Sequence, residues 1–262
     1  MPALLSVDPK GANGFRDGVV FGRARRVFLF GGNATPPQEQ GGLTLNFPPT
    51  VPINQYSAEM VFRFHARVGA WRRILDVQNR VSDSGFYVDP GNTLDVYPVA
   101  GSTSNFVNNV YHHVVLTVAN DGTIRSYLDG VPQFTIKNNT QMYVANPAGV
   151  MHLFLDNTSA GGIGEYSPGE IALFRLYGGV LSPGEVSALA GVQGPTLRVE
   201  ARGTDAVLSW PSLASDYHLE ANAAFEDGPK WIPVSGLPQT VADRLELVQP
   251  TTDAQRFYRL AK

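Results

Sequence analysis

Acidic side chains are the first residues to consider for chemistry, because cleavage of a glycosidic bond needs two carboxyl groups that reach the same bond. Alternate residues of a β-strand face the same side, so a catalytic pair on one strand is spaced two or four residues apart. The chain has no Glu-x-Asp-x-Glu run. Its strand acids are scattered singly, at Glu59, Asp76, Asp95, Asp129 and Glu170. This scattering predicts a protein without hydrolytic or eliminative activity, unless two acids meet across neighbouring strands, whose register the sequence does not show.

The five histidines show no arrangement typical of a metal site or a catalytic base. His112 and His113 are adjacent in an apolar run, and adjacent strand residues point to opposite faces of a sheet. They therefore cannot bind the same ion, and we expect one of them to lie in the core. His65, His152 and His218 stand alone, and we assign them no chemistry.

Calcium is the metal ion that suits this sequence best, because it binds hard oxygen ligands and the chain has no cysteine. Asp76, Asp156 and Asn157 lie at the ends of expected strands and are the predicted ligands, with Asp83 as a further oxygen donor. The alternative is that these residues only form turns, as Asp and Asn commonly do at strand ends.

Binding of a glycan requires exposed aromatic rings beside polar groups, because sugar faces stack on rings while sugar hydroxyls need fixed partners. The aromatic residues near the expected sheet are Trp71, Tyr87, Tyr97, Tyr111 and Tyr127. Tyr127, Tyr97 and Tyr87 are the predicted ligand-binding residues. Tyr127 is the strongest candidate for exposure, because alternation places it on the opposite strand face from Ile124 and Leu128.

Short alternating apolar runs separated by Gly, Pro, Asn and Asp must position these side chains, and such runs are typical of strands. The strands expected before residue 180 are Arg26–Phe30, Leu43–Phe47, Ala58–His65, Arg73–Val77, Thr93–Val99, His112–Ala119, Thr123–Asp129, Val150–Leu155 and Glu170–Tyr177. In Ala58–His65, the apolar Met60, Phe62 and Phe64 share one face, which predicts a sheet with one buried side. The turn Asn120-Asp121-Gly122 joins two of these runs into a hairpin.

A single helix start stands out at Ser182-Pro183-Gly184-Glu185, with Ser as N-cap, Pro at the first helical position and Glu three residues after the cap. The helix is expected to end near Ala190, because a Gly- and Pro-containing connector follows. We place a domain boundary at this connector, between residues 1–192 and residues 196–262.

A second series of strands follows the connector and predicts a small C-terminal β-sandwich. Its expected strands are Leu197–Ala201, Ala206–Trp210, Tyr217–Ala221, Trp231–Val234, Leu245–Val248 and Arg256–Leu260. A module of this size without disulfides has a thin core. The aromatic residues expected to form much of it are Trp210, Phe225, Trp231, Phe257 and Tyr258.

Composition and charge narrow the class of partner. The 262 residues carry a formal net charge of −3, and only 16% are charged. The chain has no basic patch of the kind that binds nucleic acid, and no apolar run long enough to span a membrane. We therefore expect neither nucleic acid nor membrane insertion. No leader of signal-peptide pattern begins the sequence, so an exported form is expected to carry one upstream of Met1.

Three stretches resemble the laminin-G-like branch of the concanavalin A-like lectin/glucanase superfamily. The opening stretch, at residues 22–31, reads GRARRVFLFG. The most specific stretch joins YHHVVLTV, from Tyr111, to DGTIRSYLDG, which ends at Gly130. The third joins GEIALFRLY, from Gly169, to LSPGEV, from Leu181. The C-terminal module more loosely resembles fibronectin-III-like repeats of secreted bacterial proteins, through LSWP, YHLE and the ending RFYRL.

The resemblance implies an all-β fold, an antiparallel two-sheet jelly-roll sandwich, whose concave sheet and rim loops bind glycans, proteins or calcium. The aspartate that carries a structural calcium in some relatives is Ala172 here. The function expected is a non-catalytic carbohydrate-binding module of a larger extracellular or cell-surface protein, with a glycan or an extracellular protein as partner. The alternatives are a structural or protein-adhesion pair that binds no sugar, and a polysaccharide-degrading enzyme with an unusual acid–base set.

Overall fold

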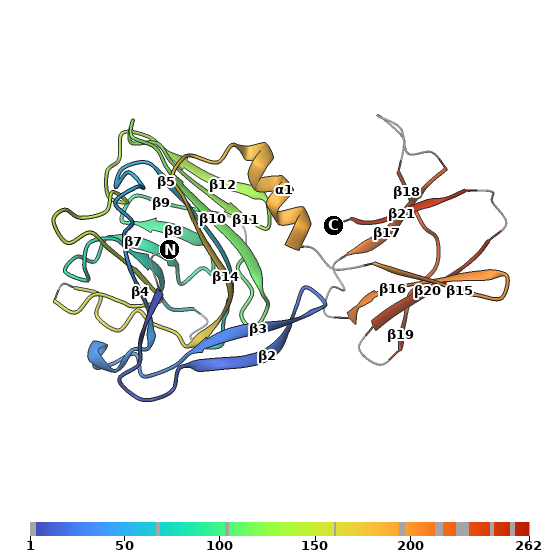
Figure 1. Ribbon diagram of the computed structural model, residues 1–262, viewed down its shortest axis with the longest axis horizontal. Helices are drawn as coiled ribbons and strands as arrows, with labels where there is room; N and C mark the ends of the chain where they lie inside the picture. Colours follow the sequence, from blue (N-terminus) through green and yellow to red (C-terminus); the bar gives the residue numbers. More distant parts are fainter. Residues whose placement is uncertain are drawn as a thin grey trace. The chain divides into compact units, whose positions relative to one another are not determined.

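The fold is described from a computed structural model, in which residues 4–66, 69–102, 105–159, 161–193, 197–212, 217–223, 231–241, 244–251 and 255–261 are described (Figure 1). The chain forms two compact units, one of Met1–Gly18 with Arg26–Val192 and the other of Val19–Arg25 with Gln193–Lys262. None of the helices within the described ranges is long and apolar enough to cross a membrane.

The first unit is a sandwich of two seven-stranded antiparallel sheets, here called sheet A and sheet B. Sheet A has the spatial order β1 (Leu4–Val7), β4 (Gly42–Asn46), β13 (Val150–Leu153), β6 (Arg72–Asp76), β7 (Gly85–Val88), β8 (Leu94–Tyr97) and β9 (Ala100–Gly101). Sheet B has the order β12 (Val131–Ile136), β11 (Ile124–Leu128), β10 (His112–Val118), β5 (Tyr56–Phe64), β14 (Gly169–Tyr177), β3 (Arg23–Phe30) and β2 (Gly14–Val20). A 3-10 turn, η1 (Pro37–Glu39), precedes β4.

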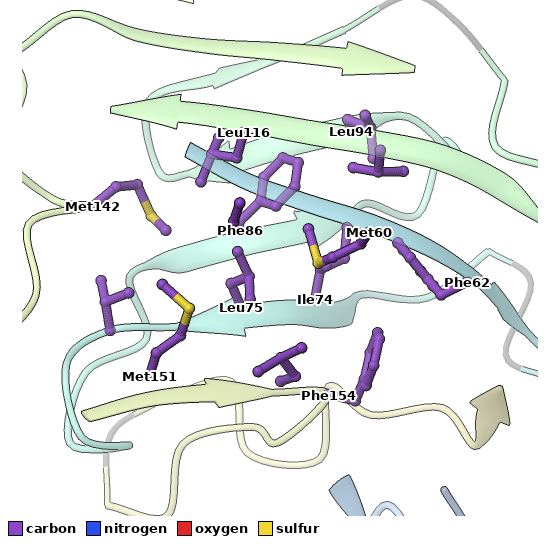
Figure 2. Packing of buried hydrophobic residues seen from close by; sticks show 14 of the residues in the cluster. Met60, Phe62, Ile74, Leu75, Phe86, Leu94, Leu116, Met142, Met151 and Phe154 are labelled. Carbon is purple, nitrogen blue, oxygen red and sulfur yellow. The ribbon is translucent and has the colours of Figure 1, made fainter. Parts of the chain in front are cut away.

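The apolar faces of the two sheets enclose a single core. Met60 and Phe62 project from β5 and Leu116 from β10 toward residues of sheet A such as Ile74 and Phe86, as Figure 2 shows. These side chains are fully buried, and burial of a large apolar side chain contributes about 1.5–3 kcal/mol. The predicted two-sheet sandwich is confirmed.

The hairpin of β10 and β11 forms where the turn residues predict it. Gly122 adopts a positive φ of 78° between the two strands, a conformation that a residue without Cβ adopts without strain. Val118 pairs with Ile124 and Val114 with Leu128, so apolar residues of both strands face the core.

The helix α1 (Pro183–Gln193) follows β14 and begins as predicted. The Ser182 Oγ accepts the backbone N–H of Glu185, and the Glu185 carboxylate accepts the backbone N–H of Ser182 at 2.7 Å. This reciprocal pair is a capping box. Val186 of the helix packs with Val115 and Tyr127, so α1 covers part of the outer face of sheet B (Figure 1).

The second unit contains two small antiparallel sheets. One has the order β15 (Arg198–Arg202), β16 (Asp205–Pro211), β20 (Arg244–Pro250) and β19 (Gln239–Val241), and the other β18 (Ile232–Pro233), β17 (His218–Asn222) and β21 (Phe257–Ala261). Trp210 and Leu208 are buried in its core, and Tyr258 packs against them. The predicted core residue Trp231 instead packs against Arg259, whose guanidinium carbon lies 4.5 Å from the Trp231 ring centroid. The predicted core residue Phe225 lies outside the described residues.

All of the strands expected from alternation are present, within a few residues of their predicted ends. The strands that the pattern does not show are β1, β2, β7, β9, β12 and β19. Five of these are edge strands, and edge strands bury few side chains, so their sequences alternate weakly. The sixth, β7, lies inside sheet A but has only four residues.

Candidate functional site

Three side chains predicted as calcium ligands meet around one point on the outer face of sheet A, and a guanidinium lies at that point. Asp76 ends β6, while Asp156 and Asn157 follow β13. Arg73 Nη1 donates to Asp76 Oδ2 at 2.6 Å. Its Nε lies 3.0 Å from Asp156 Oδ1, and its Nη2 donates to Asn157 Oδ1 at 3.3 Å. The cation that these oxygens bind in this structure is therefore Arg73.

Residues of the following loop and strand complete an oxygen shell that we call the Arg73 cage, made of Ser82, Asp83 and Tyr87 together with the three predicted ligands. The backbone carbonyls of Asp83 and Ser82 accept from Arg73 at 3.0–3.3 Å. The Tyr87 hydroxyl is a further partner of Arg73 Nη2, and the guanidinium carbon lies 4.6 Å from the Tyr87 ring centroid. Arg73 is 1% exposed. A charge so removed from water is tolerated only when it is paired and hydrogen-bonded.

The electrostatics of the cage follow from its burial. Desolvation raises the pKa values of Asp76 and Asp156 above their usual range, and the Arg73 charge opposes that rise. The Asp83 carboxylate is partly exposed and lies 3.7 Å from Arg73. Within the described ranges, no three His, Cys, Asp or Glu side chains are placed to hold a metal ion, and calcium binding remains a prediction.

An aromatic cluster of Trp71, Tyr87 and Tyr97 adjoins the Arg73 cage. Trp71 lies 5.5 Å from Tyr87 and 5.3 Å from Tyr97 between ring centroids, and Tyr87 lies 6.4 Å from Tyr97. All three pairs are edge-to-face, the arrangement that the aromatic quadrupole favours. Tyr87 is completely buried, Trp71 is half-buried, and Tyr97 is 36% exposed. Two of the three tyrosines predicted to bind a ligand thus lie together, with Tyr87 as the base and Tyr97 at the surface.

The strand register explains why these residues share a face. Arg73 of β6 pairs with Tyr87 of β7, and Tyr87 pairs with Asp95 of β8. Tyr97 follows Asp95 by two residues and so projects from the same side. Burial, together with the nearby charge of Asp89, raises the pKa of Asp95 to about 6. Sequence reasoning did not select Asp95 or Trp71 as ligand-binding residues.

The expectation that Tyr127 is exposed is wrong. Tyr127 lies on the outer face of sheet B, as alternation predicts, but it is only 1% exposed. Val186 of α1 and Leu181 pack with it and with Val115. Alternation shows which face of a strand a residue occupies, but it does not show that a later helix covers that face. The Tyr127 ring is therefore closed to a ligand in this structure. The Tyr87 ring is closed as well, because it lies beneath Trp71 and Tyr97.

The comparison with protein families decides which family this fold belongs to. The family model described as the concanavalin A-like lectin/glucanases superfamily matches residues 37–187, more than half of the chain. The chain belongs to this superfamily. The matched residues run from η1 into α1 and include the Arg73 cage, the aromatic cluster and the hairpin of β10 and β11. A comparison with curated protein sequences finds no match.

Solved structures share the concanavalin A-like fold at low sequence identity. Domain 4 of AbnA, a GH43 extracellular arabinanase from Geobacillus stearothermophilus, in complex with arabinotriose, is 18% identical. The match covers 72% of this chain and 87% of that domain, with a TM-score of 0.51. A structure described as HCR/D-Sa-GBL1/C is 11% identical, and the match covers 98% of this chain and 68% of that one, with a TM-score of 0.52.

The outer face of sheet B in this concanavalin A-like unit carries a buried carboxylate with several partners. Glu59 is fully buried, and it binds His113 Nε2 at 3.1 Å, the Tyr177 hydroxyl at 2.6 Å and Arg175 at 3.3 Å. Burial raises the pKa of Glu59, but the hydrogen bonds from His113 and Tyr177 outweigh it, so the pKa is lowered overall. The group is therefore a satisfied anion rather than a proton donor near neutral pH.

Glu170 forms a second set on the same face. Its fully buried carboxylate contacts Arg16, Arg63 at 3.0 Å, His65 at 3.3 Å and the Tyr111 hydroxyl. Glu170 pairs with Arg63 across β14 and β5, and Arg63 lies four positions after Glu59 on β5. This spacing places the backbones of the two glutamates about 13 Å apart along the strands, at about 3.3 Å per residue. Glycosidases need their two carboxyls about 5–9.5 Å apart.

The adjacent histidines point to opposite faces, as predicted. His113 contacts Glu59 on the outer face, whereas His112 contacts Asp129 at 2.8 Å and lies 4.5 Å from the Phe106 ring. His152 on sheet A lies 2.9 Å from Thr44 Oγ1. Burial and the charges of Arg80 and Arg73 lower its pKa to about 4, so His152 is neutral at pH 7.

Proposed function

We propose that this chain is a non-catalytic carbohydrate-binding module of an extracellular or cell-surface protein, and that the aromatic cluster is its binding site. The observation that carries the proposal is the edge-to-face set of Trp71, Tyr87 and Tyr97 on the outer face of sheet A. The Arg73 guanidinium lies 4.6 Å from the Tyr87 ring centroid, and Tyr87 contacts both other rings edge-to-face. A rigid ring at the surface can stack on a sugar at little cost in conformational entropy.

The superfamily and one fold neighbour support a glycan as the ligand. The name of the superfamily includes lectins, and domain 4 of AbnA is in complex with arabinotriose. Function resides in sites rather than in folds, so this likeness supports the class of ligand and not its identity.

The carboxylates support a binding role rather than hydrolysis. Glu59 and Glu170 are fully buried, and their backbones are about 13 Å apart along the strands at the rise of about 3.3 Å per residue. Each carboxylate has its own His, Arg and Tyr partners, whereas hydrolysis needs two carboxyls that act on one bond. Asp95, beside the exposed Tyr97, is the only acid of β8. The neighbouring Asp89, whose charge raises the pKa of Asp95, accepts the backbone N–H of Thr93 as a turn residue.

We assign the second unit the role of a fibronectin-III-like spacer. Its sheets of four and three strands have the strand numbers of a seven-stranded immunoglobulin-type sandwich. The chain has no cysteine, so no thiol of this chain would be oxidised in an extracellular setting.

The proposal is tested by glycan-array screening of the full chain, followed by titration calorimetry of the best ligand against three variants. Tyr97→Ala and Trp71→Ala each remove a ring of the cluster, and we expect at least tenfold weaker binding, because aromatic anchors dominate binding energy. Phe15→Ala is the matched control, since Phe15 is 65% exposed on β2 of the other sheet. Melting curves must show that the variants fold.

Two results would contradict the proposal. Unchanged affinity in both Tyr97→Ala and Trp71→Ala would move the site elsewhere. Release of reducing ends or unsaturated sugars from polysaccharides by the purified chain would show an enzyme.

A further inference from the structure

Asp95 differs from the fully buried carboxylates of the first unit in having no ion-pair partner among the described residues. Its Oδ1 is closed to solvent and has no hydrogen-bond partner, and among the described residues Asp95 makes no ion pair. Asp76, Asp156, Glu59 and Glu170 are all paired with arginine or histidine. A half-buried carboxylate without a partner lacks the compensation that such groups usually have.

The two arginines of β6, Arg72 and Arg73, bind groups other than Asp95. Arg73 is enclosed in its cage, and Arg72 is fully buried and donates to Asn92 and Asn108. Asp89 adds a second negative charge close enough to raise the pKa of Asp95. Two carboxylates therefore interact beside Tyr97, and the charge of Arg72 acts on Asp89.

A glycine lets one oxygen of Asp95 pack against the neighbouring strand. Asp95 pairs with Gly101 of β9, and a Cβ at position 101 would lie 2.7 Å from Asp95 Oδ2. Gly101 is exposed, and its φ is not in the left-handed region, so the backbone does not require glycine there. Glycine is instead the residue that leaves Asp95 in its present position, because any side chain at position 101 would displace Oδ2.

This proposal rests on the proposed function. We infer that the aromatic cluster takes a neutral glycan, and that Asp95, which projects from the same face of β8 as Tyr97, positions it by accepting a sugar hydroxyl. A hydroxyl donates to a carboxylate with the strength of a charge-assisted hydrogen bond. A uronate or sulfated sugar at the same place would meet Asp95 and Asp89 as like charges at short range, where salt screens them little.

Matched ligands separate neutral from acidic recognition. Oligogalacturonate and its methyl ester share one backbone and differ in the charge at C6, and gluco-, xylo- and arabino-oligosaccharides extend the neutral set. We expect the wild-type chain to bind at least one neutral oligosaccharide with an affinity that does not change with ionic strength. Binding of the acidic oligosaccharide is expected to be at least tenfold weaker.

Two variants test the role of Asp95 in the same calorimetric experiment. Asp95→Asn keeps the shape and removes the charge, so it should weaken neutral binding severalfold and narrow the gap to the acidic ligand. Gly101→Ala retains every charge but forces Asp95 Oδ2 to move, because the added Cβ would lie 2.7 Å from it, and we expect the same loss of neutral binding. Val99→Ala, at an exposed position two residues before Gly101, is the control and should bind as wild type.

The outcomes distinguish this inference from the proposed function. If an acidic oligosaccharide binds best and Trp71→Ala abolishes that binding, the site stands and neutral selection is refuted. If neutral binding is unaffected by both Asp95→Asn and Gly101→Ala but is lost in Tyr97→Ala, the role of Asp95 is refuted alone. If no glycan binds, or if both aromatic variants bind as tightly as the wild type, the proposed function is refuted and this inference is refuted with it.

Discussion

Arg73 is the residue on which most of the outer face of sheet A depends. It joins the end of β6 to the loop at Ser82 and Asp83, to Tyr87 of β7, and to the segment after β13. A metal ion could have bound the same oxygens. A guanidinium differs in that it belongs to the chain, so the cage needs no ion from solution to form.

Replacing Arg73 by alanine is expected to destabilise the first unit by about 3–5 kcal/mol, because it leaves buried carboxylates without a partner. Denaturant unfolding measures this loss, and Arg202→Ala, at an exposed arginine of β15, is the control. Calcium provides the second readout. The melting temperature of the wild type should be the same in chelator and in millimolar calcium, whereas Arg73→Ala should regain stability with calcium. A calcium-dependent rise in the wild type would show that the ion competes with Arg73 or binds elsewhere.

Asp95 predicts a distinct dependence of stability on pH. Its pKa is raised to about 6 from its ordinary value of 3.8, so the folded chain holds this proton more tightly than the unfolded chain. The stability contributed by the protonated form is therefore present at pH values below about 3.8 and is lost as the pH rises through 6. Asp95→Asn should raise the melting temperature at pH 7 but not at pH 4. A larger gain at pH 4 would contradict the assigned direction.

At the scale of the element, α1 begins at a cap that the local sequence encodes, and it covers part of the outer face of sheet B. Its start depends on the Ser182–Glu185 pair, and its Val186 covers Val115 and Tyr127. The cover explains why a tyrosine on an outward face is buried. The aromatic cluster, with its exposed Tyr97, lies on the outer face of the other sheet, sheet A.

Removing the helix cap tests this connection. Ser182→Ala is expected to lower the free energy of unfolding by about 1 kcal/mol. The backbone N–H of Glu185 loses its acceptor, Ser182 Oγ, and the Glu185 carboxylate is no longer held by the Ser182 hydroxyl. Ser187→Ala is the control, since Ser187 is exposed within the same helix. Urea unfolding monitored by circular dichroism measures both variants, and equal stabilities would show that the cap contributes nothing to the folded chain.

For the whole molecule, the two units differ in the size of their cores. The core of the first unit extends over both seven-stranded sheets, whereas that of the second contains few fully buried residues, among them Trp210 and Leu208. Small cores give marginal stability, so the second unit is expected to unfold first.

Calorimetry should therefore show two transitions. Trp210, in the second unit, should report the earlier transition by fluorescence in a chain carrying Trp71→Phe and Trp231→Phe. Near-ultraviolet dichroism of the tyrosine-rich first unit should report the later one. A single transition at which both signals change together would show that the units unfold as one.

The strand pattern, the β10–β11 turn and the Ser182 cap were legible in the sequence, because alternation, turn chemistry and capping are local properties of neighbouring residues. The same holds for the opposite orientations of His112 and His113. The sequence also grouped Asp76, Asp156 and Asn157 as oxygen donors at strand ends. It did not show that Arg73 lies among them, that α1 covers Tyr127, or that Asp95 stands beside Tyr97 without an ion-pair partner among the described residues. These features depend on which strands are neighbours and on what packs over them. Contacts between residues distant in the chain are decided only when the whole tertiary structure forms.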